Sequence, residues 1–325
     1  MKLLIAGAGF TVSDFLPITK DLDNIELVSI VGVESDLDKM KDYQLKYGIK
    51  TIYTDYDEAL KNTYIDTVYV AVPNFLHFKF AKKALEAGKN VICEKPFTVK
   101  YQEFKELRRI AKEKQLILVE AITNQYLTNY QQLKRELKKI GKVKIVSMNY
   151  SQYSHRYDAF KEGKVLPAFD PKKGGGALMD LNIYNIHFLI GLFGMPKLVE
   201  YKANIERDID TSGILNLDYG NFKAVSIAAK DVSAPVTSLI EAEDNTIVIN
   251  GPANIMDSFD IVDHNSHVTH IDKKIYSHRM YEEFKAFAKM IDKQDFKEDQ
   301  IALNHSDQVM QVLEKAINSA KLKLG

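Results

Sequence analysis

The chain opens with Lys2-Leu3-Leu4-Ile5-Ala6-Gly7-Ala8-Gly9-Phe10-Thr11-Val12, an apolar run that ends in closely spaced glycines. The pattern predicts a β-strand, a tight turn and the start of a helix, which is the arrangement that binds the diphosphate of a dinucleotide. Gly7 allows the tight turn, and Gly9, with Phe10 beside it, lets backbone amides approach the diphosphate. Val12 replaces the usual third glycine, so an ordinary glycine turn after a strand is the competing interpretation.

Between residues 1 and 121 the chain alternates short β-rich runs with amphipathic segments. Continuous apolar runs are typical of strands covered on both faces, and Leu76–Ala87 and Tyr101–Lys112 are long enough to form crossover helices. The alternation predicts an α/β domain over residues 1–121, built on a doubly wound parallel sheet. The expected strands are Lys2–Ala6, Glu26–Val33, Thr67–Val72, Asn90–Cys93 and Leu116–Glu120.

Between residues 122 and 325 the pattern changes, because strand-like segments follow one another with few helices between them. This predicts an α+β domain over residues 122–325 with an open, mainly antiparallel sheet and a helix over Met179–Leu192. We expect this domain to bind the substrate. Since Phe222–Ala229 carries apolar side chains at alternate positions, we expect a homodimer or homotetramer through the bare face of the sheet. The expected strands are Lys144–Tyr153, Lys197–Glu206, Gly213–Tyr219, Phe222–Lys230, Thr237–Glu241 and Thr246–Asn250.

The composition argues against several classes of protein. Lys plus Arg equals Asp plus Glu at 44 each, so no net basic field is available for nucleic acid or an anionic membrane surface. The single cysteine, Cys93, excludes an intramolecular disulfide framework and a multi-cysteine metal site, and no metal is expected. No apolar run reaches the roughly 18 residues that a membrane span requires, so we expect a soluble protein. The single cysteine fits a reducing cytoplasm, and since charge gives no sign of a polymeric partner, we expect a small-molecule substrate.

An acidic residue follows the second expected strand. Glu34 stands about 25 residues after Gly9, near the position where a carboxylate accepts hydrogen bonds from the adenosine ribose. A carboxylate there repels a 2′-phosphate, and Ser35 rather than an arginine follows it, so the sequence favours NAD over NADP. A solvated glutamate at a strand end is the alternative.

Two further turns follow expected strands, at the edge of the sheet where such folds bind ligands. After the strand that ends at Val72, Pro73, Asn74 and His77 are expected near the cofactor, although Asn74 could simply cap the next helix and His77 could be structural.

Glu94-Lys95-Pro96 ends the strand around Cys93 and is also expected at the cofactor. Burial and a nearby oxidised nicotinamide would lower the pKa of such a lysine toward that of an acid-base group. The alternative is an ion pair between Glu94 and a neighbour, with Lys95 in solvent.

The second half holds one polar pattern on an otherwise apolar helix. After Gly174-Gly175-Gly176, the residues Asp180, Tyr184 and His187 are spaced so that one face of an α-helix carries a carboxylate, a phenol and an imidazole. A solvent-facing polar stripe is the alternative, but such stripes favour Lys and Glu. The trio therefore indicates a functional site.

Taken together, the glycine turn, Pro73-Asn74 with His77, Glu94-Lys95-Pro96 and the triple glycine followed by Asp180 resemble the Gfo/Idh/MocA family, which includes glucose-fructose oxidoreductase and inositol dehydrogenase. The resemblance implies a Rossmann domain joined to an open-sheet domain, and hydride transfer between a nicotinamide and a hydroxyl carbon, usually of a sugar, cyclitol or related polyol.

The resemblance also implies roles for single residues. Lys95 matches the active-site lysine and Asp180 the active-site aspartate of the family. Tyr184 stands where many members have a catalytic histidine and some have a tyrosine. Asn182 replaces a usual glycine and His187 occupies a position often held by aspartate, and both are expected to contact the substrate.

These residues predict an oxidoreductase in which Tyr184 accepts the substrate's proton while the hydride leaves for NAD. A free phenol has a pKa of roughly 10, so a cation is needed near it, and Lys95 is expected to supply that charge while Asp180 orients the sugar or the lysine. Two alternatives stay open: a non-catalytic NAD-binding sensor, and a glycosidase-like enzyme of the same fold that uses NAD only transiently.

Overall fold

The computed structural model describes residues 1–325 and contains two compact units. Unit 1 comprises Met1–Ala121 and Met280–Asp307, and unit 2 comprises Ile122–Arg279 and Gln308–Gly325. The expected division at residue 121 therefore differs from the structure at residues 280–307, which pack with unit 1. The reason is an aromatic contact that chain order does not reveal: the Phe284 ring lies 4.1 Å from that of Phe15 and 5.0 Å from that of Tyr69.

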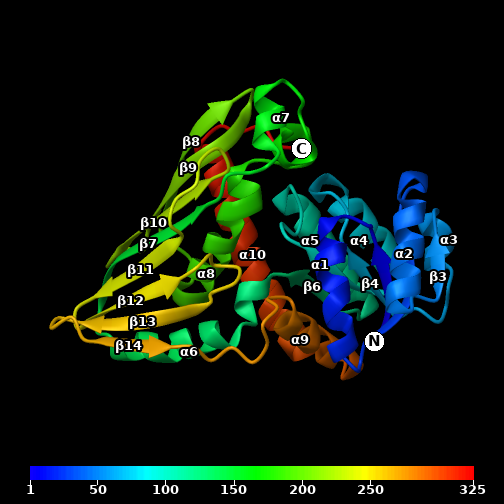
Figure 1. The fold of residues 1–325 in the computed structure, drawn as a ribbon, viewed down its shortest axis with the longest axis horizontal. Coiled ribbons are helices and arrows are strands. Elements are labelled where there is room, and N and C mark those ends of the chain that lie inside the picture. Colours follow the sequence, from blue (N-terminus) through cyan, green and yellow to red (C-terminus); the bar gives the residue numbers. More distant parts are fainter. The chain divides into compact units, whose positions relative to one another are not determined.

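Unit 1 is built on a six-stranded sheet with the order β3-β2-β1-β4-β5-β6. All of its strand pairs are parallel, as expected, and helices lie on the sheet (Figure 1). The strand order changes direction at β1, which pairs with both β2 and β4, and such a switch point is where doubly wound sheets bind ligands. The strands are β1 (Lys2–Ala6), β2 (Glu26–Val31), β3 (Thr51–Tyr53), β4 (Thr67–Val70), β5 (Asn90–Glu94) and β6 (Leu118–Ala121).

Helices α1 to α5 connect consecutive strands of this sheet. The glycine turn leads into α1, and α2 and α3 pack against β2 and β3. Helices α4 and α5 match the two expected crossover helices. The bounds are α1 (Phe10–Phe15), α2 (Leu37–Tyr47), α3 (Tyr56–Leu60), α4 (His77–Glu86), α5 (Tyr101–Lys114) and α9 (Tyr281–Asp292).

Unit 2 is built on an eight-stranded sheet with the order β14-β13-β12-β11-β7-β10-β9-β8. Only the β7–β10 pair is parallel, so the sheet is mixed but mainly antiparallel, as expected. Strands β13 and β14 were not predicted, because Asp260 and His270 interrupt their apolar patterns. The strands are β7 (Val143–Ser151), β8 (Leu198–Glu206), β9 (Ile209–Asp218), β10 (Lys223–Ala229), β11 (Thr237–Ala242), β12 (Asn245–Asn250), β13 (Ser258–Asp263) and β14 (Val268–Ile271).

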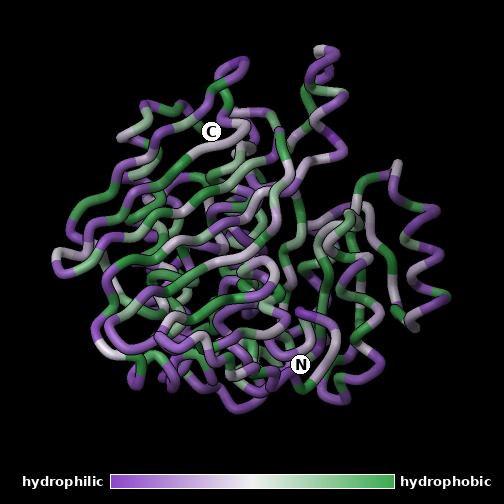
Figure 2. Tube along the Cα trace, turned by 60° about the vertical axis from the view of Figure 1, so that its left-hand side comes forward, coloured by the Kyte–Doolittle hydropathy of each residue, from purple (hydrophilic) through white to green (hydrophobic).

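One face of this sheet is covered by helices α8 and α10 (Figure 1). Along β10, Ala224, Ser226 and Ala228 are buried, whereas Val225 and Ile227 between them are partly exposed. Hydrophilic and hydrophobic residues alternate along several strands of the molecule (Figure 2). The helices are α6 (Thr128–Glu136), α7 (Tyr157–Lys161), α8 (Ile183–Phe193) and α10 (Phe296–Ser319), of which residues 308–319 belong to unit 2 and residues 296–307 to unit 1.

The helical run Pro171–Phe193 has a mean hydropathy of 1.2 in its most apolar window, enough by length and composition to cross a membrane. In the structure 78% of that window is buried inside the protein, as is typical of a core helix.

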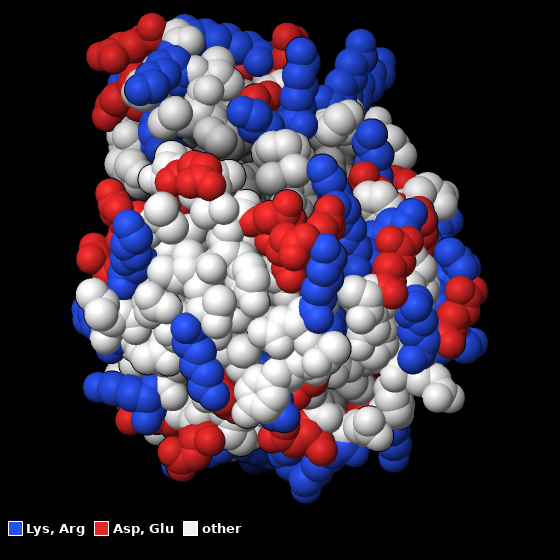
Figure 3. Space-filling view, turned by 90° about the vertical axis from the view of Figure 1, so that its right-hand side faces the viewer, with Lys and Arg blue, Asp and Glu red and all other residues white.

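On the protein face shown in Figure 3, acidic and basic side chains are interspersed rather than gathered into a field of one sign.

Candidate functional site

The glycine turn after β1 contains two glycines that the fold treats differently. Gly7 has a φ of 116°, and a Cβ there would collide with the carbonyl oxygen of Ala71, so the fold itself requires glycine. A Cβ on Gly9 would have nothing within 4 Å. The chain's own packing therefore leaves open space at Gly9, where a ligand's diphosphate can approach the backbone. Phe10, the next residue, is 75% exposed and is available for ligand contact.

The loop after β2 carries the predicted ribose-binding carboxylate. Glu34 is exposed and begins a short 3₁₀ turn that includes Asp36, directly after the exposed Val33. Two carboxylates thus lie at the carboxyl end of a strand that borders β1. This arrangement suits ribose hydroxyls and opposes a 2′-phosphate.

The turn after β4 is tied to the turn after β5 by a buried histidine. His77 is 1% exposed, and its Nδ1 and Nε2 atoms lie 2.9 Å from the carbonyl oxygens of Pro96 and Val72, respectively. Burial lowers the pKa of His77, and the two backbone hydrogen bonds oppose that shift. These contacts favour the structural alternative over direct cofactor contact: His77 joins the two turns. Pro73 and Asn74 lie in the turn that it holds.

The turn after β5 begins with a buried carboxyl group. Glu94 is 9% exposed, and its Oε1 accepts a hydrogen bond of 2.6 Å from the hydroxyl of Tyr69. Lys95 follows as a half-buried residue, so it does not extend freely into solvent. Glu120 of β6, which sequence reasoning missed, accepts hydrogen bonds from the Phe97 amide at 3.0 Å and from a serine of α10 at 2.7 Å. It anchors this turn from the neighbouring strand.

In unit 2 the predicted helix does not begin as an α-helix. Leu178–Asn182 forms a π-helical turn, and α8 begins only at Ile183. The prediction that Asp180, Tyr184 and His187 share one helix face assumed α-helical spacing throughout. It is corrected for Asp180, which lies in the π-helical turn. The Asp180 side chain is 34% exposed, Tyr184 is 7% exposed, and His187 is fully buried. Single π-helical turns occur frequently at functional sites.

Two of the predicted substrate-binding residues are fully buried. Asn182 accepts a hydrogen bond from the amide of Asn185 at 3.2 Å and from the hydroxyl of Ser226, and it donates to the Ser226 carbonyl at 3.4 Å. The carbonyl of His187 accepts a bond of 3.0 Å from Gln125. Both residues are 0% exposed, which argues against direct substrate contact and for a role in fixing the helix within unit 2.

The triple glycine serves close packing. A Cβ on Gly175 would clash with the backbone of Ala168, and one on Gly176 with the carboxylate of Asp210. Asp210 accepts hydrogen bonds from the Leu178 amide at 2.7 Å and from a tyrosine hydroxyl at 2.8 Å, and so caps the π-helical turn. Burial raises the pKa of Asp210 to about 6. Sequence reasoning missed it, because Asp210 lay between the expected strands Lys197–Glu206 and Gly213–Tyr219, where an aspartate is typical of a turn.

A second missed residue contacts Asp180. Lys230, directly after β10, is 2% exposed, and its Nζ lies 2.8 Å from Oδ2 of Asp180. The same Nζ donates to the carbonyl of Ala168 at 2.7 Å. The available signal was a lysine at the end of an apolar strand, the same signal that singled out Lys95.

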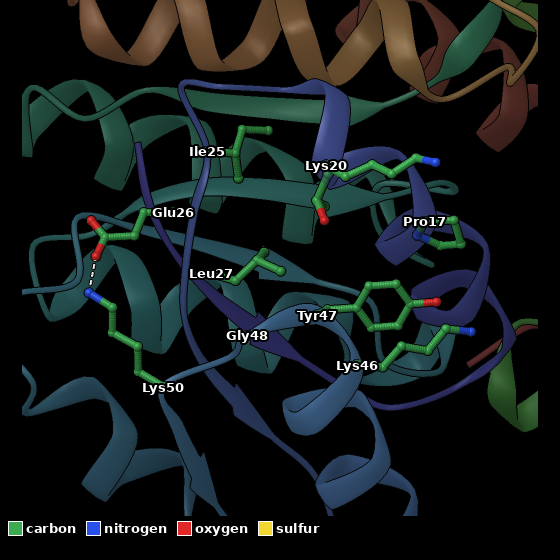
Figure 4. Close-up of a pocket in the computed structure, with 10 residues that line it drawn as sticks. Pro17, Lys20, Ile25, Glu26, Leu27, Lys46, Tyr47, Gly48 and Lys50 are labelled. Carbon is green, nitrogen blue, oxygen red and sulfur yellow. Dashed lines mark hydrogen bonds and ion pairs between the residues drawn. The ribbon is translucent and has the colours of Figure 1, made fainter.

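The surface of unit 1 also has a pocket of about 540 Å³ around the start of β2, lined by Ile25, Glu26, Leu27 and Lys50 among others (Figure 4). It lies at the amino end of that strand, and none of the predicted residues lines it. No group of three or more His, Cys, Asp or Glu residues is arranged to hold a metal ion.

Comparisons with known proteins place these features in a family. A model described as an oxidoreductase family with an NAD-binding Rossmann fold matches residues 1–122, and a GFO/IDH/MocA C-terminal domain matches residues 130–253. The chain is 34% identical to scyllo-inositol 2-dehydrogenase (NADP(+)) IolU of Bacillus subtilis, over 77% of this chain and 76% of that protein. It is 28% identical to trans-1,2-dihydrobenzene-1,2-diol dehydrogenase of Xenopus tropicalis, over 66% and 64% of the two chains.

Among solved structures, the 3-ketoreductase KijD10 of Actinomadura kijaniata, in complex with NADP and TDP-benzene, superimposes with a TM-score of 0.87. The match covers 98% of this chain and 97% of the other at 18% identity, so it shows a shared fold. The family models and the identity to IolU show more: the chain belongs to the Gfo/Idh/MocA family of NAD(P)-dependent oxidoreductases.

Proposed function

We propose that this oxidoreductase transfers a hydride between a nicotinamide cofactor and a hydroxyl-bearing carbon of a sugar, cyclitol or related polyol. The observation that carries the substrate class is the placement of Asp180 and Tyr184 four residues apart in a helical run that is otherwise buried and largely apolar. A carboxylate and a phenol suit the hydroxyl groups of a polyol. The name of the relative IolU, an inositol dehydrogenase, supports the same class.

For the cofactor we propose NAD in preference to NADP. The open space at Gly9 fits a dinucleotide diphosphate, and the exposed Glu34 with Asp36 would repel a 2′-phosphate. Two similar proteins are associated with NADP instead: IolU is named for NADP(+), and KijD10 was crystallised with NADP. The nicotinamide, when bound, takes up or gives the hydride. Gly7, Gly9, Phe10 and Glu34 are the residues of unit 1 that would hold its adenosine diphosphate part.

For the proton we propose Tyr184, assisted by Lys95 and Asp180. The phenol of Tyr184 accepts the proton of the substrate hydroxyl in the oxidation direction and returns it in reduction. Lys95 supplies the positive charge that a phenol needs in order to give up a proton near neutrality. Asp180, the most exposed of the polar trio, orients the substrate hydroxyls.

A screen of sugars, cyclitols and polyols with NAD and with NADP, followed by the absorbance of the reduced nicotinamide, tests this function. We expect reduction of the cofactor with at least one cyclitol or polyol. Product formed with no net redox change would instead support the glycosidase-like alternative. Cofactor binding without turnover of any hydroxyl substrate would support the sensor alternative and overturn the proposed function.

We also propose a cytoplasmic homodimer or homotetramer formed through the sheet of unit 2. Ile145 of β7 is 49% exposed and Ile214 of β9 is 43% exposed, and Val225 and Ile227 of β10 are partly exposed near them. A second copy on this face would remove these apolar side chains from water. Light scattering at micromolar concentration should show a species of at least twice the chain's mass of 37.0 kDa, and a monomer would refute this assembly.

A further inference from the structure

A buried lysine cation in unit 2 has no role in the chemistry described so far. Lys230 is 2% exposed, although a lysine ammonium buried without partners is among the most costly groups in a folded protein. Its backbone is fixed on both sides, since its amide donates to the Thr211 carbonyl at 2.8 Å and its carbonyl accepts from the Ser154 amide at 2.9 Å. The side chain therefore starts from a rigid point at the end of β10.

The ammonium has three distinct neighbours. It forms the 2.8 Å ion pair with Oδ2 of Asp180, donates the 2.7 Å hydrogen bond to the Ala168 carbonyl, and lies 4.5 Å from the centre of the Phe169 ring. Phe169 is itself part of a buried cluster with Phe160 and Ile209. The carbonyl and the ring carry no formal charge, so the Asp180 carboxylate is the neighbour among these three that neutralises the ammonium.

The carboxylate belongs to an irregular part of the helical run. Asp180 sits in the π-helical turn, where backbone hydrogen bonds close to the fifth residue rather than the fourth, and its side chain is 34% exposed. The side-chain torsions of an aspartate have several wells, and its partners decide which of them is occupied. A charge-assisted bond from a rigid, buried donor favours the rotamer that keeps Oδ2 against that donor.

We propose that Lys230 is a positioning residue, which holds Asp180 in the orientation that it needs to bind the substrate hydroxyl groups. This role rests on the proposed function, because it assigns Lys230 no contact with substrate of its own. Lys230 acts through Oδ2 of Asp180, and the carbonyl of Ala168 and the ring of Phe169 keep the ammonium in place.

A double-mutant cycle separates this role from simple packing. Lys230→Met removes the charge at nearly constant length and should lower kcat by about tenfold or more, as expected when a substrate-orienting group is misplaced. In an Asp180→Asn background the same change should cost less than about twofold, because the two residues then act as one unit. Equal losses in both backgrounds would mean that Lys230 supports the fold only, and would overturn the inference.

Lys89 in unit 1 provides a matched control. It is 8% exposed, and its Nζ donates to the carbonyls of Asn62 at 3.0 Å and Ile65 at 2.7 Å, with no carboxylate bonded to it. Lys89→Met should lower the melting temperature with kcat unchanged. If Lys230→Met does not fold, Lys230→Gln takes its place in the cycle, because its amide keeps a donor for the Ala168 carbonyl.

A crystal structure of the Lys230 variant gives a readout that does not require turnover. The Asp180 side chain should change rotamer or split into several, with the backbone of Leu178–Asn182 unchanged. An Asp180 rotamer identical to that of the unmodified protein would overturn the inference. If Asp180→Asn alone keeps full turnover, the proposed function of Asp180 is wrong, while the rotamer still reports whether Lys230 holds it.

Discussion

In unit 1 the candidate residues lie in the loops that directly follow β1, β2, β4 and β5, whereas in unit 2 they lie on one helical run fixed by residues from distant strands. In unit 1 each candidate residue stands within a few positions of the strand that places it, as Gly7 and Gly9 do after β1. In unit 2 Asp180 is held by Lys230, 50 positions further along the chain. The candidate cofactor residues therefore depend mainly on local motifs, whereas the candidate substrate residues depend on contacts with distant parts of the chain.

The two histidines do not follow this contrast, because both are buried. His77 belongs to a local motif in unit 1, yet its contacts with two backbone carbonyls are structural. His187, on the helix of unit 2, is fully buried while Tyr184 retains 7% exposure. A chemistry-bearing residue type therefore indicates function only together with its exposure, and four experiments probe this difference between the units.

The largest expected effect concerns the proton. Tyr184→Phe should lower kcat by about two orders of magnitude or more, the range typical of lost acid-base catalysis, and leave cofactor affinity intact. His187→Gln should reduce kcat far less and act through stability, because the imidazole is fully buried. The measurement is steady-state turnover on folded protein, with cofactor titration as the control. Near-normal turnover of the tyrosine variant beside an inactive His187 variant would assign the proton to His187.

The next effect concerns the cap of the π-helical turn and is one of stability. Burial raises the pKa of Asp210 to about 6, so the folded protein holds this proton more tightly than the unfolded chain does. Stability from this group is therefore present at about pH 4 and is lost as the pH rises through about 6, by up to roughly 3 kcal/mol.

Denaturant unfolding of the wild type and of Asp210→Asn at pH 4 and pH 7 measures that change. The stability of the variant relative to the wild type should rise between the two pH values. Asp299 in unit 1 has its pKa raised by burial, also to about 6, so Asp299→Asn is the matched variant from the other unit. A pH-independent difference for Asp210→Asn would contradict the expected shift.

Variants of Gly7 and Gly9 should distinguish an effect on stability from an effect on dinucleotide binding. Gly7→Ala places a side chain at a φ of 116° against a carbonyl, so it should destabilise unit 1 by about 1–3 kcal/mol. Gly9→Ala meets open space and should leave the melting temperature unchanged. It should weaken dinucleotide binding about tenfold, or roughly 1.4 kcal/mol, measured by calorimetry. Unaltered affinity in Gly9→Ala would remove the diphosphate from this turn.

The smallest expected effect is cofactor choice, because Glu34 is exposed and water screens its charge. NAD should bind more tightly than NADP by about tenfold or less, and Glu34→Gln should narrow that ratio by improving NADP binding. Serine at position 35 leaves no cation there to reverse the preference. Equal or tighter binding of NADP by the unmodified protein would take the ribose role away from Glu34.

The sequence predicted the features that depend on neighbouring residues and missed those that depend on contacts between distant parts of the chain. The strands β1 and β5 and the helices α4 and α5 were predicted within a few residues, because apolar periodicity and flanking turns define them locally. Chain order put helix α9 in the second domain, whereas the structure groups it with unit 1, since its place beside Phe15 depends on packing. The π-helical turn was missed because the spacing argument assumed one helical period.

By itself the sequence determined the parallel α/β architecture of unit 1, the mainly antiparallel sheet of unit 2 and the family, because all three depend on repeating patterns and short motifs. Only the tertiary structure showed that His77 bridges two turns, that Asp210 caps the start of the helical run and that Lys230 forms an ion pair with Asp180. These contacts join residues with no sequence pattern in common. Burying a polar or charged group without a partner costs free energy, and folding brings these partners together from distant parts of the chain.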